Sequence, residues 1–302
     1  MAKRPKAIPQ MTTAQFENMF PDEAACKTYL QSRRWPEGVH CPRCGSAERV
    51  HPVKSMPFKW QCYSCTSGSG YRFSVIAGTI FENTNKPLRD WFRIVHLMLA
   101  SKKGMSSLQI QRMMGFGSYE TALHMTHKIR AALIAPETKL GGIVEVDDTW
   151  VGGKAYNKHG KRSGGGRGGA GSGKVPVIGA IERQGNVVAR VLKRVSSRAA
   201  EMFVQETVSN KVSLIATDTA SAYKRIGNSF PHGSVNHNIG QYVVGAVHTN
   251  TIEGFWSIFK RGIVGSYHKV SAKYLPLYVA EFQFRYNNRQ NPDIFGAAIA
   301  GC

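Results

Sequence analysis

The stretch Ile143-Val-Glu-Val-Asp-Asp-Thr-Trp-Val151 decides the fold class, because the apolar residues change there from helical spacing to alternation, which predicts a strand. Gly185-Asn186 predicts a hairpin turn further along the chain. The elements predicted after the first strand are two strands, a helix, a strand and three helices, at Val175–Glu182, Val187–Val195, Arg198–Ser209, Val212–Thr217, Ser221–Arg225, Thr251–Ser266 and Lys273–Asn288. This order predicts a domain with a mixed α/β sheet.

Three acidic residues stand at the element boundaries of this domain. Asp147 interrupts an otherwise apolar strand, Asp218 ends another strand, and Glu253 lies in the first turn of a helix. Strand ends that border a cleft are where ligands gather, whereas a carboxylate inside the core is costly without a partner. Carboxylate oxygens suit Mg²⁺ or Mn²⁺, and two such ions about 4 Å apart can activate a nucleophile and stabilise the leaving oxygen of a phosphodiester.

The helix that carries Glu253 has an apolar stripe at helical spacing, formed by Ile252, Phe255, Trp256, Phe259 and Ile263. Glu253 and Lys260 are seven residues apart, so they point within about 20° of each other along one edge of this stripe. We expect this edge to border both the buried face of the helix and a groove in which the acids of the sheet face DNA.

Each acid also has a purely structural explanation. The tetrapeptide Asn250-Thr-Ile-Glu253 fits a capping box, in which the glutamate reaches back to the first backbone amide. Asp218 could cap the helix that follows it, and the pair Asp147-Asp148 could bind Lys154. The residues alone leave these alternatives open.

A glycine-rich basic segment, residues 157–174, separates the first two strands, and no acid occurs between Asp148 and Glu182. It contains no Gly-Lys-Ser/Thr followed by a helix, which disfavours a nucleotide-binding P-loop. A flexible basic loop that orders against DNA is the favoured interpretation. A solvated linker without a function is the alternative.

Four of the six cysteines form two CxxC pairs, Cys41-Pro-Arg-Cys44 and Cys62-Tyr-Ser-Cys65, with 17 residues between them. This spacing lets two turns present four thiolates to one tetrahedral Zn²⁺. Four protein ligands leave no open position, so the predicted zinc ion is structural. Cys26 lies in a helical stretch and is expected to be a small core residue.

The segment of residues 86–139 is predicted to be helical. Leu88–Ala100 is an apolar helix, and Ser106 and Ser118 are expected to cap two further helices that Gly115-Phe-Gly117 joins. Two short helices joined by a glycine turn, with basic residues on the second, resemble a helix-turn-helix. A plain helical bundle with a basic surface is the alternative.

The composition indicates a polyanionic partner. The 302 residues are enough for two or three domains, and 40 Lys+Arg against 19 Asp+Glu give a formal charge of +21. Nucleic acid is the usual partner of such a charge. No stretch approaches the ~20 apolar residues that span a bilayer, and the basic N-terminus lacks the apolar part of a secretory signal. We therefore expect a cytoplasmic protein without a membrane partner, whose cysteines bind metal rather than form disulfides.

Several motifs together resemble a known family. They are Arg34-Trp-Pro-Glu-Gly-Val-His-Cys-Pro-Arg-Cys44, Val144-Glu-Val-Asp-Asp-Thr-Trp-Val-Gly-Gly-Lys154, Asp218 with Tyr223, His248-Thr-Asn-Thr-Ile-Glu-Gly-Phe-Trp-Ser-Ile-Phe-Lys-Arg261 and Glu281-Phe-Gln-Phe-Arg-Tyr-Asn-Asn-Arg289. The chain resembles bacterial insertion-sequence transposases of the DDE class with an N-terminal zinc ribbon, the ISXO type. It departs from them at Asp148, where the family usually has glutamate after the first acid.

The resemblance implies an RNase H-like catalytic domain at residues 140–302. Asp147, Asp218 and Glu253 would be its first, second and third catalytic acids and would hold two Mg²⁺ or Mn²⁺ ions. Some relatives use an asparagine as third residue, which makes Asn250 a secondary candidate.

The resemblance also implies a reaction. Ends of the element would be hydrolysed, and the freed 3′-OH would attack target DNA without a covalent protein–DNA intermediate. Lys260 would contact DNA at the cleavage site, and His248 would support the site.

The whole chain is thus predicted to be multidomain α+β. Its predicted parts are an N-terminal helical segment at 1–40, a zinc ribbon at 41–85, a helix-turn-helix-like DNA-binding domain at 86–139 and the catalytic domain at 140–302. The basic residues expected to contact DNA are Arg112, Lys128, Arg130, Lys154, Arg162, Arg167, Lys174, Lys260 and Arg261.

The expected partners are the double-stranded transposon ends, the target DNA and a second copy of the chain, or more, in the synaptic complex. Two alternatives remain: a non-catalytic DNA-binding regulator derived from a transposase, and an RNase H-like nuclease that cuts without joining.

Overall fold

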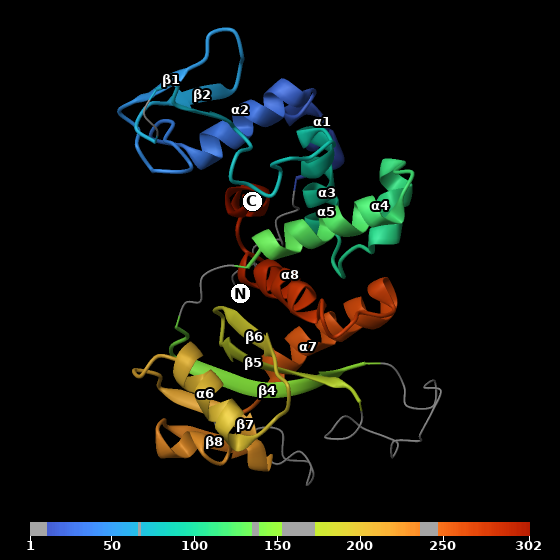
Figure 1. Ribbon diagram of the computed structural model, residues 1–302. Coiled ribbons are helices and arrows are strands. Elements are labelled where there is room, and N and C mark those ends of the chain that lie inside the picture. Colours follow the sequence, from blue (N-terminus) through green and yellow to red (C-terminus); the bar gives the residue numbers. More distant parts are fainter. Residues whose placement is uncertain (1–10, 66–67, 135–138, 153–172, 236–246) are drawn as a thin grey trace, which may run out of the picture. The chain divides into compact units, whose positions relative to one another are not determined.

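The computed structural model describes residues 11–65, 68–134, 139–152, 173–235 and 247–302 (Figure 1). The chain divides into two compact units. The first contains Met1–Leu133 together with Gln290–Cys302, and the second contains Ile134–Arg289. Within the described ranges, no helix combines the length and the apolar character that crossing a bilayer requires.

The first unit combines helices with a small sheet. Its described elements are α1 (Thr13–Met19), α2 (Glu23–Arg34), β1 (Val50–Pro52), β2 (Lys59–Cys62), β3 (Tyr71–Ser74), α3 (Leu88–Ala100), α4 (Ser107–Met114), α5 (Tyr119–Ala132) and α9 (Ile294–Gly301). Side-chain oxygens of Ser106 and Ser118 accept hydrogen bonds from backbone N–H groups of α4 and α5, as their sequence predicts. Gly115 ends α4 with φ of 67°, a left-handed conformation that favours glycine.

The last helix, α9, belongs to the core of this first unit. Its Phe295 is 4% exposed, and its ring packs against four aromatic rings of α1, α2 and α3, namely those of Phe16, Phe20, Tyr29 and Phe92. Arg33 of α2 also pairs with Asp293 just before α9. The sequence assignment placed residues 290–302 in the catalytic domain, whereas the aromatic packing places them with the N-terminal helices.

The three short strands of the first unit form an antiparallel sheet in the order β1-β2-β3. Trp60 of β2 is 7% exposed and packs between Trp35 and Phe73, with ring centroids 5.3 and 6.0 Å away. The three rings form a buried aromatic cluster at this small sheet.

The second unit is built on a five-stranded mixed sheet in the order β6-β5-β4-β7-β8. Strand β5 is antiparallel to both of its neighbours, β4 and β6, whereas β4, β7 and β8 run parallel to one another. Its elements are β4 (Ile143–Val151), β5 (Val175–Glu182), β6 (Val187–Val191), α6 (Ser197–Thr207), β7 (Leu214–Asp218), η2 (Ser221–Tyr223), η3 (Ile226–Asn228), β8 (His232–Val235), α7 (Asn250–Gly262), the π-helix η5 (Ile263–Tyr267) and α8 (Leu275–Asn287).

Helices cover both faces of this sheet (Figure 1). Phe203 of α6 packs on the face that contains Val144 and Val146. Trp256 of α7 and Phe282 of α8 pack on the opposite face. Because successive side chains of a strand point to opposite faces, the position of a residue in β4 decides which helix it meets.

The structure confirms the predicted fold class, a multidomain α+β chain with a four-cysteine ribbon, helical parts and a mixed sheet that is consistent with an RNase H-like domain. Several elements were not predicted, among them the short strands β1, β2 and β3, the turn of helix η3, strand β8 and helix α9. Strand β8 has the sequence His-Gly-Ser-Val, which lacks alternating apolar residues, and α9 is a short apolar segment without a polar face. Helix α7 also begins one residue earlier than expected, at Asn250, and continues into η5.

Candidate active site and metal centre

The four predicted zinc ligands come together. The ligand atoms of Cys41, Cys44, Cys62 and Cys65 all lie within 4.8 Å of one another. The Sγ atoms of Cys41 and Cys65 are 3.3 Å apart, and those of Cys44 and Cys62 are 3.7 Å apart. Thiolates at about 2.3 Å from a tetrahedral zinc ion are about 3.8 Å from each other, so the cluster fits one Zn²⁺.

The two predicted aspartates stand on neighbouring parallel strands. Glu145 of β4 is paired with Ala216 of β7, and Asp147 and Asp218 each lie two residues beyond this pair. Equal displacement along adjacent strands keeps them side by side, and an even displacement puts both on the face of Glu145. This is the face that α7 covers, because Thr251 and Ile252 at the start of α7 contact Glu145.

Asp147 experiences the charge of the other acids. Burial is the largest factor that raises its pKa, and the negative charges of Asp148, Asp218 and Glu253 add to it, so that the pKa reaches about 7. A hydrogen bond from the backbone of Asp148 opposes this rise. Four carboxyl groups within electrostatic reach form a site that attracts cations.

Asp148 points to the other face of the sheet and is held there by a hydrogen bond. The hydroxyl of Tyr223 donates to its Oδ1 at 2.7 Å. Burial raises the pKa of Asp148, whereas hydrogen bonds from the side chains of Tyr223 and Trp150 and the charge of Lys260 lower it. The hydrogen bond from Tyr223 distinguishes Asp148 from Asp147. The two acids could not be told apart by their adjacent positions in the sequence.

Glu253 is exposed in the first turn of α7. The hydroxyl of Thr249 donates to its Oε1 at 3.0 Å. The N-cap of α7 is Thr249, not Asn250, so the capping box considered for the tetrapeptide beginning at Asn250 does not form. Asn250 itself is exposed at the first position of the helix.

The start of α7 is anchored by Glu145, a residue that sequence reasoning did not select. Its side chain is completely buried, and its Oε2 accepts hydrogen bonds from the backbone N–H groups of Thr251 at 2.8 Å and Ile252 at 3.0 Å. These N–H groups have no partner within the helix, and a carboxylate at this end also suits the helix dipole. Glu145 therefore attaches the first turn of α7 to β4.

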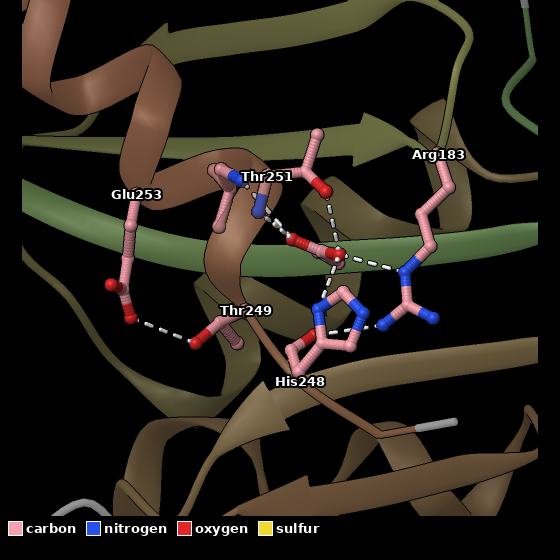
Figure 2. A network of polar contacts seen from close by, with 7 residues as sticks. Arg183, His248, Thr249, Thr251 and Glu253 are labelled. Carbon is pink, nitrogen blue, oxygen red and sulfur yellow. Dashed lines mark hydrogen bonds and ion pairs between the residues drawn. The ribbon is translucent and has the colours of Figure 1, made fainter. Parts of the chain in front are cut away.

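Three further groups contact the other oxygen of Glu145. The Oε1 atom accepts from Arg183 Nε at 2.7 Å and from the Thr251 hydroxyl at 2.9 Å, and it lies 3.2 Å from His248 Nδ1. Arg183 also donates to the carbonyl of His248 at 3.1 Å. Figure 2 shows Arg183 and Glu253 on opposite sides of the first turn of α7. The network thus fixes the turn that carries Glu253, while Glu253 itself points away from it.

The only sequence signal for this role was the position of Glu145. It lies between two valines and two residues before Asp147, so it shares a face with Asp147. The partners Arg183 and Thr251 are 38 and 106 residues away, and no local pattern links them to it.

The predicted DNA-contacting residues have different surroundings. Arg112 and Lys128 are exposed on α4 and α5, as are Lys260 and Arg261 on α7, and Lys174 is partly exposed. Lys154, Arg162 and Arg167, with most of the glycine-rich segment, lie outside the described residues.

Arg130 is a correction to the prediction. Its side chain is 0% exposed, and its Nη2 is 3.5 Å from the carbonyl oxygen of Met105. It follows Ile129 and lies one turn after Thr126, so helical spacing places it on the buried face of α5. A buried guanidinium cannot reach phosphate, and Arg130 is removed from the candidate DNA contacts.

Comparisons with known proteins agree with this architecture. Residues 139–287 match the family model of the ISXO2-like transposase domain, and residues 21–67 match that of the transposase zinc-ribbon domain. An uncharacterized protein in transposable element ISH50 of Halobacterium salinarum is 28% identical over 279 residues, which cover 88% of this chain and 91% of that protein.

A solved structure is also similar, but only weakly. It is a chain in the simian T-cell lymphotropic virus intasome in complex with PP2A regulatory subunit B56 gamma, with 15% identity and a TM-score of 0.31. The similarity covers 64% of this chain and 65% of that chain, slightly less than two thirds of its length. The two family models show that the chain contains an ISXO2-like transposase domain at residues 139–287, preceded by a transposase zinc ribbon at residues 21–67.

Proposed function

We propose that this chain is a DDE-type DNA transposase. It binds the terminal inverted repeats of an insertion sequence, cleaves DNA at these ends in a metal-dependent reaction and joins the freed ends to target DNA. The observation that carries this proposal is the position of Asp147 and Asp218, side by side on one sheet face, with Glu253 in the turn of α7 that is anchored to the same face.

The three acids would hold the divalent cations. Carboxylate oxygens are the ligands that Mg²⁺ and Mn²⁺ prefer, and two ions shared between the acids would suit cleavage of a phosphodiester. When bound, Mg²⁺ or Mn²⁺ would supply activation of the nucleophile and stabilisation of the leaving oxygen.

The residues of the chain provide the orientation. Thr249 holds one oxygen of Glu253, and the Glu145 network fixes the turn in which both residues lie. The charge of Lys260, two turns further along α7, lowers the pKa of Asp148, and in our proposal Lys260 contacts the phosphate of the cleaved strand. Asp148 is directed by Tyr223 toward the other face of the sheet, and we assign it a supporting role.

Substitution of the three acids tests the proposal. Asp147→Asn, Asp218→Asn and Glu253→Gln keep the side-chain shape but remove the charge, so each is expected to lower cleavage of a transposon-end fragment at least 1000-fold. Binding of the same fragment should change little. Cleavage and joining are measured with a labelled end fragment and a target plasmid in Mg²⁺.

Glu206→Gln is the matched control, because Glu206 is an exposed acid of the same unit that pairs with Arg190. It should leave cleavage within about twofold of the unsubstituted protein, as expected for a surface pair. Activity that survives Glu253→Gln but not Asn250→Ala would move the third ligand to Asn250. Cutting without joined products would indicate a nuclease, and binding without cutting a regulator.

A transposase must bring two ends together, and we propose that a homodimer or a larger assembly does so on DNA. The charge of +21 fits phosphate contacts and predicts strongly salt-dependent binding.

A further inference from the structure

A pocket of ≈ 590 Å³ lies in the second unit, at the ends of β4 and β6 and the start of β5. Its volume is in the range of small-ligand sites. The residues around it include Trp150, Lys174, Pro176, Lys193, Arg194 and Ser196. Nothing in the proposed reaction uses this pocket.

The pocket carries a net positive charge. Lys174, Lys193 and Arg194 line it, and no acid does so among the residues that the structure describes. Lys193 and Arg194 are exposed, and neither has an ion-pair partner in the described part of the chain. Two cations without counter-charge at one pocket favour an anionic ligand.

The pocket also borders the start of α6. Ser196 is the N-cap of this helix of 11 residues, and its hydroxyl accepts from the N–H of Ala199. The other N–H groups of the first turn have no partner within the helix. They add donors for an anion to the three basic side chains.

Trp150 provides the pocket with an aromatic surface. Its side chain is partly buried and forms a hydrogen bond to Asp148, which orients the indole. An indole beside basic groups is the combination that binds a nucleotide, because bases stack on aromatic rings while phosphates pair with cations.

The pocket is close to the proposed active site. Trp150 is three residues after Asp147 on β4, which corresponds to about 10 Å along the strand, and its side chain is on the opposite face of the sheet, with Asp148. That distance is a few nucleotides along a DNA strand. A DNA strand cleaved beside Asp147 would reach the pocket by passing over the end of β4, from the α7 face of the sheet to the α6 face.

We propose that this pocket holds one unpaired nucleotide of the DNA substrate, a few nucleotides from the cleaved phosphodiester. The base stacks on Trp150, and the phosphate lies between Lys193, Arg194 and the start of α6. This inference rests on the proposed function, because it requires DNA at the acids.

Abasic substitutions in the DNA test the base contact. A labelled transposon-end fragment is prepared with one base removed at each position around the cleavage site, and its dissociation constant is measured by fluorescence anisotropy. Removal at one position should weaken binding by the full-length protein about tenfold, as expected for loss of a base–aromatic stack. Trp150→Leu should weaken binding of intact DNA equally and abolish the effect of that position.

Trp150→Phe is the control for folding, because it keeps an aromatic ring and should restore most of the effect of the missing base. If removal of the base weakens binding by Trp150→Leu as much as binding by the unsubstituted protein, the proposal is overturned. So would the absence of any sensitive position.

The phosphate contact is tested by the salt dependence of binding. Lys193→Ala and Arg194→Ala should each lower the slope of log Kd against log salt by about 0.9. Lys211→Ala removes an exposed lysine after the other end of α6 and should leave the slope unchanged. Equal slopes for all three variants would contradict the phosphate contact.

Cleavage is measured on the same fragments. Unsubstituted protein that binds the ends but cuts none of them would contradict the proposed function, whereas the pocket would still be judged by binding. If the unsubstituted protein cuts the ends, but the Trp150 variants bind intact and abasic DNA as it does, only the proposal of a nucleotide pocket is contradicted.

Discussion

Three carboxylates of β4 have three different surroundings although they lie within four residues. Glu145 is fully buried and surrounded by donors, Asp147 faces other acids, and Asp148 is bound by Tyr223 on the opposite face. A buried charge is tolerated only where partners replace water. At the residue scale, these surroundings support our proposal that Glu145 positions the site and that Asp147 would bind cations.

Glu145→Gln tests the positioning role. The amide cannot serve both backbone donors and Arg183, and it leaves the guanidinium of Arg183 without its carboxylate. We expect a loss of about 3 kcal/mol in the free energy of unfolding. We also expect the cleavage rate at saturating DNA to fall about 100-fold, because the turn that carries Glu253 shifts. Urea unfolding measures the loss of stability. The cleavage rate is measured in single-turnover experiments under conditions in which the variant is folded.

Glu281→Gln is the matched control for this variant. Glu281 of α8 is also fully buried, and it pairs with Arg285 at 3.3 Å. Its loss should destabilise the protein by a similar amount but leave cleavage within about threefold. Equal loss of cleavage in both variants would show that Glu145 acts through stability alone.

Helix α7 packs closely against strand β5, and the glycine at position 179 of β5 makes this close packing possible. Gly179 is paired with Asp147 across β4 and β5. A Cβ atom at Gly179 would lie 2.7 Å from Cζ2 of Trp256. The indole of Trp256 is 3% exposed and has no space to move away, so glycine is what lets α7 pack against the strand beside Asp147.

Gly179→Ala is therefore expected to lower the free energy of unfolding by about 1–3 kcal/mol, through overpacking against Trp256. Gly254→Ala, in the exposed part of α7, is the opposite case, because its Cβ would meet nothing within 4 Å. It should raise stability by about 0.5–1 kcal/mol by reducing the entropy of the unfolded chain. Urea unfolding measures whether each variant lowers or raises the free energy of unfolding. An unchanged value for Gly179→Ala would refute the close contact with Trp256.

At the scale of the whole molecule, the chain returns to its first unit at the end. After residue 289 it leaves the second unit, and α9 completes the aromatic core around Phe16, Phe20 and Phe92. The first unit thus depends on residues from both ends of the sequence. Its stability cannot be assigned to the N-terminal residues alone.

Phe295→Ala tests this organisation. Removal of a buried ring with four aromatic neighbours should cost the first unit about 3–5 kcal/mol. Hydrogen exchange followed by mass spectrometry should show lost protection in residues 11–133 and unchanged protection in residues 139–289. Phe203→Ala, in the core of the second unit, should give the reverse pattern. Lost protection confined to the second unit in Phe295→Ala would contradict the assignment of α9.

The features that the sequence determined by itself are local ones. The spacing of Cys41, Cys44, Cys62 and Cys65 predicted a cluster that the structure brings together. The alternation in residues 143–151 predicted the strand at the centre of the sheet, and Ser106 and Ser118 predicted two helix starts. These patterns are readable because they depend on neighbours within a few residues, whose geometry the backbone sets.

Only the tertiary structure decided which distant groups meet. Glu145 acquired partners 38 and 106 residues away, Arg130 became buried, and α9 joined the first unit. Such contacts follow from strand register and from which helix face packs on which sheet face. A one-residue change in either would move every side chain to another neighbour, and the linear sequence does not specify that choice.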